Sequence, residues 1–217
     1  MRIKFLGHAA FFIVSNEGKR IITDPYQSGA YDGQVAYKPI VEECDIVTIS
    51  HEHADHSYIG RELGAPDIVN TPGVKVVKGI EIKGISTYHD KSQGKERGTN
   101  IIFVFNVDGF RMCHLGDLGH VLDDATVKEI GEVDILLIPV GGFFTIDAKD
   151  AEEIVNKLNP KITIPMHYKT SACGFPIAPV DDFIKGKPNV KKLGKSEIEI
   201  TELPSSPEIW VLEPALV

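Results

Sequence analysis

Residues 51–56 read His-Glu-His-Ala-Asp-His, which brings three imidazoles and two carboxylates into one short segment. Imidazole nitrogens and carboxylate oxygens are common ligands of divalent transition metals. The segment directly follows residues 46–50, a β-branched and apolar run typical of a buried central strand. Polar side chains that follow such a strand often form a site at the edge of its sheet. The sequence therefore predicts a metal site at this strand end.

The spacing within the segment predicts two neighbouring metal positions. Side chains alternate along an extended chain, so His51 and His53 project to one side and can bind one ion. Asp55 and His56 lie where the chain turns into its next element, where an aspartate is suited to cap a helix, and they are expected to face a second ion. Glu52 alternates away, toward the surface or behind a ligand. Solvated histidines would explain a lone His-x-His pair, but not the whole cluster.

Four ligands do not complete two ions, because a catalytic zinc usually takes about three protein ligands and a water. Three further candidates lie at the ends of predicted strands. His89 follows Ile-Ser-Thr-Tyr, Asp117 ends His-Leu-Gly-Asp, and His167 ends Ile-Pro-Met-His. Since loops at strand ends converge in such folds, we expect these side chains to join the first four.

The elements that must position these residues are mostly strands. Short apolar runs bounded by turn residues predict strands at residues 3–6, 10–14, 20–23, 46–50, 79–88, 100–107, 110–115, 134–139 and 161–165. Residues 16–18 and 108–109 have the composition of hairpin turns. Helical spacing predicts helices at 125–130 and 148–158, the second ending before Pro160. Since no linker or repeat divides the chain, we expect one domain over residues 1–217, with two packed sheets covered by helices.

Composition narrows the function further. The net charge is −8, from 31 acidic and 23 basic residues, and there is no basic run, which argues against nucleic acid as a partner. Polar residues interrupt the first dozen positions, so neither a signal peptide nor a membrane span is indicated, and a cytoplasmic protein without a membrane partner is expected. The three widely separated cysteines predict small buried side chains rather than disulfides. A homo-oligomer is compatible with the sequence.

The ordered set of motifs resembles the metallo-β-lactamase superfamily over nearly the whole chain. His-x-His-x-Asp-His is followed in order by His89, Gly116-Asp117 and His167, and both Phe-Leu-Gly-His-Ala-Ala-Phe at 5–11 and Thr-Asp-Pro at 23–25 match its N-terminal strands. Arg-Gly-Thr-Asn at 97–100 is most similar to the branch that includes ascorbate-6-phosphate lactonase, uncharacterised Zn-dependent hydrolases and distant phosphodiesterases. The chain departs from common members after His89, where Asp-Lys-Ser replaces the familiar turn.

This resemblance implies an αββα sandwich, in which two mixed β-sheets pack face to face and are flanked by helices. It also implies a set of ligands for one or two divalent ions, Zn or else Mn, Fe or Ni. The first ion would be bound by His51, His53 and His89, the second by Asp55, His56 and His167, with Asp117 bridging. Asp55 and Asp117 are the predicted catalytic residues, and Asp55 is expected to orient the attacking water and pass its proton to the leaving group.

Other polar residues could support this chemistry. Asp24, beside Pro25 at a predicted strand end, is expected to orient a ligand imidazole, and the alternative is an ordinary turn aspartate. His114 could be a hydrogen-bonded core histidine or part of the site. Four residues are candidates for contacts with a substrate, and structural or solvated roles are the alternative for each: His8, Arg97, His120 and Lys169.

The functional prediction is a metal-dependent hydrolase that uses a metal-activated water to cleave a small lactone or ester, which can be phosphorylated. A phosphodiesterase acting on a nucleotide or phospholipid headgroup is the nearest alternative. A non-catalytic metal-binding scaffold is the alternative from another class, disfavoured because structural zinc sites are usually closed and rich in thiolates.

Overall fold

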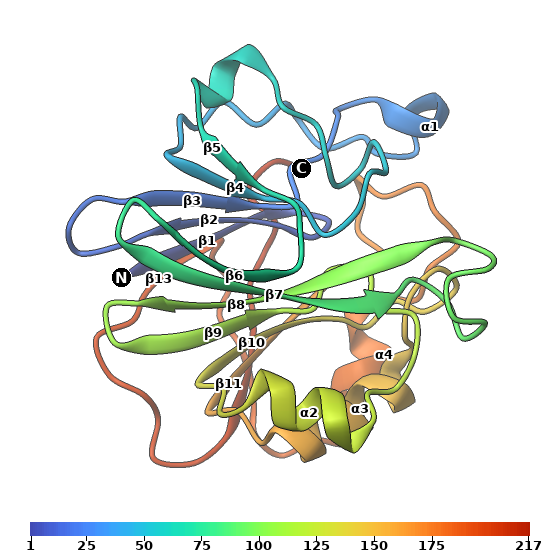
Figure 1. The fold of residues 1–217 in the computed structure, drawn as a ribbon. Coiled ribbons are helices and arrows are strands. Elements are labelled where there is room, and N and C mark those ends of the chain that lie inside the picture. The colour runs from blue at the N-terminus through green and yellow to red at the C-terminus, as the bar shows by residue number, and fades with distance from the viewer.

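Two β-sheets pack face to face in the computed structural model, which describes residues 1–217 (Figure 1). The smaller sheet has six strands in the order β13-β1-β2-β3-β4-β5. Its strands are β1 (Arg2–Gly7), β2 (Ala10–Val14), β3 (Arg20–Thr23), β4 (Ile46–Thr48), β5 (Asp67–Val69) and β13 (Glu197–Glu199). The sheet is mixed, because β3, β4 and β5 are parallel while β13, β1, β2 and β3 pair antiparallel.

The larger sheet has eight strands in the order β12-β14-β11-β10-β9-β8-β7-β6. Its strands are β6 (Gly73–Val77), β7 (Ile80–Tyr88), β8 (Thr99–Val107), β9 (Phe110–His114), β10 (Ile135–Pro139), β11 (Ile162–Met166), β12 (Val190–Lys192) and β14 (Glu208–Val211). The five strands in the order β9-β10-β11-β14-β12 pair parallel, and β6 to β9 form an antiparallel meander. Parallel strands end at the same edge, so the loops after β9, β10 and β11 lie together.

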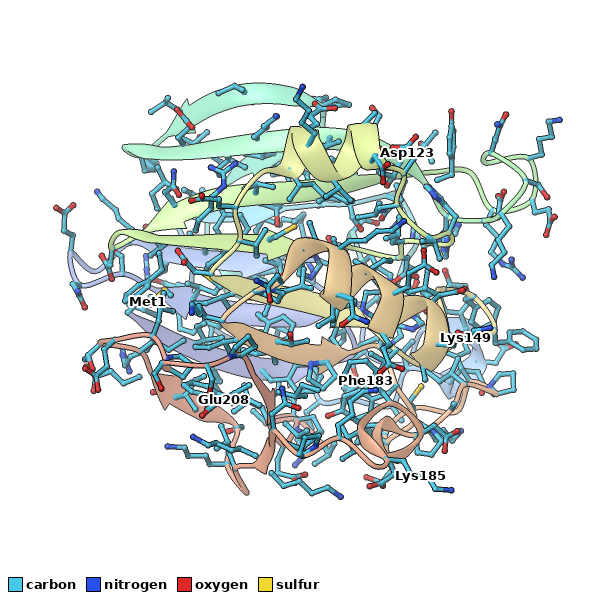
Figure 2. The ribbon with its side chains drawn as sticks, turned by 90° about the horizontal axis from the view of Figure 1, so that it is seen from below. Met1, Asp123, Lys149, Phe183, Lys185 and Glu208 are labelled. Atoms are coloured by element: carbon cyan, nitrogen blue, oxygen red, sulfur yellow. The ribbon has the colours of Figure 1, made fainter.

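Three helices cover the outer face of the larger sheet: α2 (Asp124–Ile130), α3 (Ala148–Leu158) and α4 (Val180–Ile184). Seen from below, they lie side by side, with Asp123 before α2, Lys149 in the first turn of α3 and Lys185 after α4 (Figure 2). The outer face of the smaller sheet is covered by loops, the one-turn α1 (Ala30–Gly33) and the 3₁₀ turn η1 (Arg61–Leu63). No helix is both long and apolar enough to cross a membrane.

The alternation of side chains explains why the sheets stack. In β2, Phe11 and Ile13 belong to the core between the sheets, whereas Ala10 belongs to a second apolar cluster on the outer face. The all-apolar β10 is buried along its whole length, since one face meets the smaller sheet and the other meets the helices. This arrangement confirms the expected αββα sandwich.

Each predicted strand and helix is present to within two residues of its expected ends, and Asp108-Gly109, both with positive φ, turns β8 into β9. One local expectation is wrong. No helix begins at Asp55, because residues 54–56 form a turn, and the Asp55 carboxylate contacts the His8 ring instead.

Candidate metal centre

The seven predicted metal ligands meet at one edge of the sandwich. Residues 51–56 follow β4, His89 follows β7, Asp117 follows β9 and His167 follows β11. The loops after β7 and β11 lie toward the right of Figure 1, on the same side as α1. The fold therefore brings together side chains that are more than a hundred positions apart in the sequence.

Asp117 lies at the middle of this cluster. Its Oδ2 is 3.2 Å from Nε2 of His56, 3.4 Å from Nε2 of His89 and of His167, and 3.9 Å from Nε2 of His51. The buried Nε2 atoms of His51 and His56 and Oδ1 of Asp117 have no hydrogen-bond partner. Buried polar atoms without partners are costly in a folded protein, and a cation would satisfy all of them. The cluster thus fits divalent metal ions.

Two groups of His and Asp atoms, each with its atoms within 4.8 Å of one another, could hold an ion, and a third group, Asp24 with His51 and His56, overlaps both. The first group contains His51, His53 and His89, and the second contains Asp55, His56, His167 and also His8. Asp117 faces imidazoles of both groups. The first group has the residues predicted for one ion, and the second has those predicted for the other together with His8.

Burial and mutual charge set the protonation of the cluster in the metal-free chain. Burial lowers the pKa of His51 to about 3, and it also lowers the pKa of His89. Although burial opposes ionisation, the neighbouring imidazoles hold the pKa of Asp117 well below its usual range. Burial likewise opposes a charge on His56, but the carboxylates of Asp117 and Asp55 raise its pKa well above 6.5. His51 and His89 are thus neutral at pH 7, as metal ligands must be.

Asp24 contacts the imidazole of one predicted ligand directly and that of a second through Ser50. Its Oδ2 lies 3.0 Å from Nδ1 of His56, and its Oδ1 accepts the Ser50 backbone N–H at 2.8 Å. The Ser50 hydroxyl donates to Asp24 Oδ2 at 2.5 Å and lies 2.9 Å from Nδ1 of His51. Contacts of this kind fix the ring and direct its other nitrogen toward the ion. The role of Ser50 was missed, although a hydroxyl directly before the first histidine is a usable signal.

Close backbone packing places Asp117. Its backbone N–H donates to Asn100 Oδ1 at 2.9 Å, and a side chain on Gly116 would collide with both Asn100 and Ser50. A Cβ on Gly119 would lie 2.3 Å from the backbone of His89. The two glycines of the Gly-Asp-Leu-Gly motif therefore lie where neighbouring loops approach too closely for a side chain.

His8 and His114 are both buried, and neither lines the open cavity. Nε2 of His8 lies 2.9 Å from Asp55 Oδ2, so the ring stands behind a predicted ligand. Nε2 of His114 lies 2.9 Å from the Ala9 carbonyl, and its Nδ1 accepts the Gly116 N–H at 3.2 Å. His114 is thus a hydrogen-bonded core residue beneath the Asp117 loop.

The ligands open onto a cavity of about 330 Å³, a size suited to a small molecule. Its walls are formed by five predicted ligands (His53, Asp55, His89, Asp117 and His167) together with Tyr31, Arg97, Phe144 and Phe175. Of the predicted substrate contacts, only Arg97 lines it. The Lys169 ammonium instead donates to the Phe175 carbonyl at 2.8 Å, and the His120 ring lies against Tyr88 and Val121. The aromatic walls were missed because they come from irregular loops.

A family model described as "Beta-lactamase superfamily domain" matches residues 2–167. The chain belongs to the metallo-β-lactamase superfamily. Superfamily relatives named "UPF0173 metal-dependent hydrolase" occur in Thermococcus onnurineus, at 33% identity, and in Carboxydothermus hydrogenoformans, at 32% identity. Each alignment covers 78% of this chain and 85% of the relative.

Solved structures of the superfamily agree. A protein from Thermotoga maritima, described as a Zn-dependent hydrolase of this superfamily, is 40% identical, has a TM-score of 0.80, and is aligned over 97% of both chains. Igni18 of Ignicoccus hospitalis, described as a metallo hydrolase, shares the fold at 21% identity and a TM-score of 0.59, over 84% of this chain and 88% of its own. With its His/Asp cluster, this member of the superfamily is a metal-dependent hydrolase.

Proposed function

We propose that this chain hydrolyses a small lactone or ester that carries an anionic group, such as a phosphate or carboxylate. One observation carries the proposal: the cluster around Asp117 opens onto a small-molecule cavity that has Arg97 on its wall. A closed, purely structural metal site would have no such opening, which disfavours a scaffold role.

The two groups of ligand atoms would hold two divalent ions, with Asp117 between them. Zn²⁺ is the first candidate, because the Thermotoga maritima protein is described as Zn-dependent. When bound, such ions lower the pKa of a coordinated water and polarise the oxygen of the scissile group.

Asp55 is the residue proposed to move the proton. Its carboxylate lines the cavity, and the neighbouring imidazoles of His56 and His8 lower its pKa although burial opposes them. An ionised Asp55 can accept the proton of the attacking water and pass it to the leaving oxygen. Asp117, between the two groups, holds the imidazole cluster together by its charge.

Arg97 is the residue proposed to bind the anionic group of the substrate. Its guanidinium is the one cationic side chain among the cavity residues. A guanidinium can form two parallel hydrogen bonds with a phosphate or a carboxylate, which gives direction as well as charge. The anion would thus fix the substrate with its scissile bond over the ligands.

Metal analysis followed by hydrolysis assays tests this proposal. The panel contains lactones and carboxylic esters, each with and without a phosphate, and phosphodiesters. We expect metal-dependent turnover of the anionic lactones or esters. Asp55→Ala should abolish turnover, whereas Glu52→Ala, at an exposed position of the same segment, should retain it. A preference for phosphodiesters would favour the phosphodiesterase alternative, and full metal loading without any hydrolysis would overturn the proposal.

A further inference from the structure

Three aromatic side chains line the cavity beside the predicted metal ligands. Tyr31 comes from α1, Phe144 from the loop after β10, and Phe175 from the loop after β11. Tyr31 is 45% exposed, and the two phenylalanines are only half-buried. Apolar surface left open inside a cleft, next to convergent polar groups, is characteristic of a ligand contact rather than of core packing.

The rings form one continuous wall. Tyr31 and Phe175 meet edge to face with centroids 5.6 Å apart, and Phe175 meets Phe144 in the same way at 5.4 Å. At the far end, the guanidinium carbon of Arg97 lies 5.7 Å from the Phe144 ring centroid. An apolar surface therefore runs along the cavity and ends at a single cation.

Hydrogen bonds between the loops hold two of these rings in place. The Lys169 ammonium donates to the Phe175 carbonyl at 2.8 Å, and the Gly174 N–H donates to the Gln34 carbonyl at 2.7 Å. The second bond ties the loop of Phe175 to the segment that carries Tyr31. A wall fixed before binding loses little conformational freedom when a ligand enters.

Backbone hydrogen bonds, one within the loop and one to a neighbouring loop, hold the Phe144 loop in place. The Phe144 N–H donates to the Gly142 carbonyl at 2.8 Å, and the Ile146 N–H donates to the Leu118 carbonyl at 2.9 Å. Phe143, the adjacent residue, has a φ of 62° and its side chain is turned to solvent, with 63% exposed. The left-handed backbone at Phe143 thus separates one solvent-facing ring from the ring that lines the cavity.

Polar partners are scarce on these walls. Apart from the predicted metal ligands, only the Tyr31 hydroxyl and the Arg97 guanidinium offer polar side-chain atoms among the cavity residues. A polyhydroxylated sugar would leave several hydroxyls without partners after losing water, which is unfavourable. An apolar ring of similar size would instead gain contact along the whole wall.

We infer that the substrate carries an apolar group, preferably an aromatic ring, that packs on Tyr31, Phe144 and Phe175 while its anionic group pairs with Arg97. This inference rests on the proposed hydrolysis of a lactone or ester and narrows it to aryl or hydrophobic acyl compounds. It also separates this chain from lactonases that act on sugar phosphates.

A pair of inert ligands tests the inference without turnover. Phenylphosphonate and methylphosphonate share one anionic head and differ in the apolar group. Calorimetric titration of the Zn-loaded protein should show phenylphosphonate binding tighter by about 10-fold or more, because its ring adds buried apolar surface. Equal dissociation constants for the two ligands would overturn the inference.

Variants then locate the contact. Phe144→Ala, Phe175→Ala and Tyr31→Ala should each bring the ratio of the two dissociation constants closer to one, and Tyr31→Phe should preserve it. Tyr58→Ala is the control, since that exposed ring does not line the cavity, and it should keep the wild-type ratio. Melting temperature and metal content of each variant identify those that fail to fold. A ratio unchanged in all three ring variants would overturn the assignment.

The two proposals fail in different ways. A phenyl preference without hydrolysis of any ester or lactone would leave the aromatic site standing and overturn the proposed function. Turnover of anionic esters with equal binding of the two phosphonates would do the reverse.

Discussion

Nε2 of His8 lies 2.9 Å from Oδ2 of Asp55, and the backbone carbonyl of His8 accepts the N–H of His167 at 2.8 Å. One residue at the end of β1 therefore contacts two predicted ligands that come from different sheets. Its backbone is left-handed, with a φ of 55°, a conformation that is uncommon outside glycine. We conclude that His8 positions the carboxylate of Asp55.

Replacing His8 should therefore weaken catalysis or metal binding and leave the cavity walls intact, because His8 does not line the cavity. We expect His8→Ala to lower kcat or metal affinity by roughly 10–100-fold, the usual cost of losing a partner behind a ligand. His8→Gln, whose amide can reach a similar position, should recover part of the loss. Steady-state kinetics with metal analysis measure both. His120→Ala, away from the cavity, is the control, and an equal loss in His8→Gln and His8→Ala would point to a purely structural role.

Asp24 and Ser50 should control metal affinity rather than substrate binding. Asp24→Asn and Ser50→Ala each remove a contact that directs the rings of His56 or His51. We expect Zn²⁺ affinity to fall by roughly 10–100-fold in each, as measured by competition with a chelator. Thr48→Val, in β4 two residues before Ser50, removes a buried hydroxyl that has no hydrogen-bond partner and should leave Zn²⁺ affinity unchanged. Wild-type affinity in Asp24→Asn would contradict this prediction.

The strands that carry the site were predictable because their residues are buried in regular patterns. Residues 46–49 are all β-branched and buried, residues 135–139 are apolar throughout, and each run matches a strand within the sandwich. In contrast, β6 was not predicted, because it is an edge strand whose residues are almost all exposed. Such a strand is formed by its pairing with β7, and its own sequence carries no alternation of burial.

The candidate site was likewise predictable only where regular strands position its residues. The predicted His and Asp ligands follow predicted strands, so their convergence at one edge could be inferred from the sequence. Tyr31, Phe144 and Phe175 lie in loops whose paths depend on bonds to distant segments, such as that from Gly174 to Gln34. Lys169 is an error of the opposite kind. It lies close to His167 in the sequence and was expected to contact a substrate, but in the structure its ammonium donates to the Phe175 carbonyl.

Asp90 should act on substrate binding through Arg97. Its buried carboxylate accepts the backbone N–H groups of Ser92, Gly94, Glu96 and Arg97 at 2.8 to 3.1 Å and so shapes the loop that presents the guanidinium. We expect Asp90→Ala to raise KM for an anionic substrate by about 10-fold, since each lost charged hydrogen bond is substantial, with a smaller change in kcat.

Hydrogen exchange provides an independent measurement for this loop. Amides of residues 92–97 should exchange faster in Asp90→Ala than in the wild type. Lys91→Ala is the control, because it removes an exposed ammonium that pairs with Asp150 and makes no contact with the Asp90 carboxylate, and it should change neither KM nor exchange appreciably. An unchanged KM in Asp90→Ala, with faster exchange, would show that the loop does not position Arg97 for binding.

The metal-free protein should lose stability as the pH falls from 7 to 5. Burial lowers the pKa of His8 to about 4 and that of His51 to about 3, and it lowers those of His89 and His114 as well. Between these values and the ordinary value of 6.5, the unfolded chain binds protons that the folded chain excludes. Stability therefore decreases as the pH drops below 6.5.

One group opposes this trend. The raised pKa of His56 stabilises the folded chain fully below 6.5, and that contribution is lost only as the pH rises through its folded value. Four imidazoles have lowered pKa values and one has a raised pKa, so we expect a net loss of stability on acidification. The carboxylates of Asp55 and Asp117 have lowered pKa values and contribute equally to stability at pH 7 and pH 5.

Thermal unfolding of chelator-treated protein should show Tm lower at pH 5 by at least about 3 °C, given roughly 2–4 °C per kcal/mol for a chain of this size. A Tm that is equal or higher at pH 5 would contradict the prediction and would mean that the stabilisation from protonated His56 outweighs the cost of the four imidazoles with lowered pKa values.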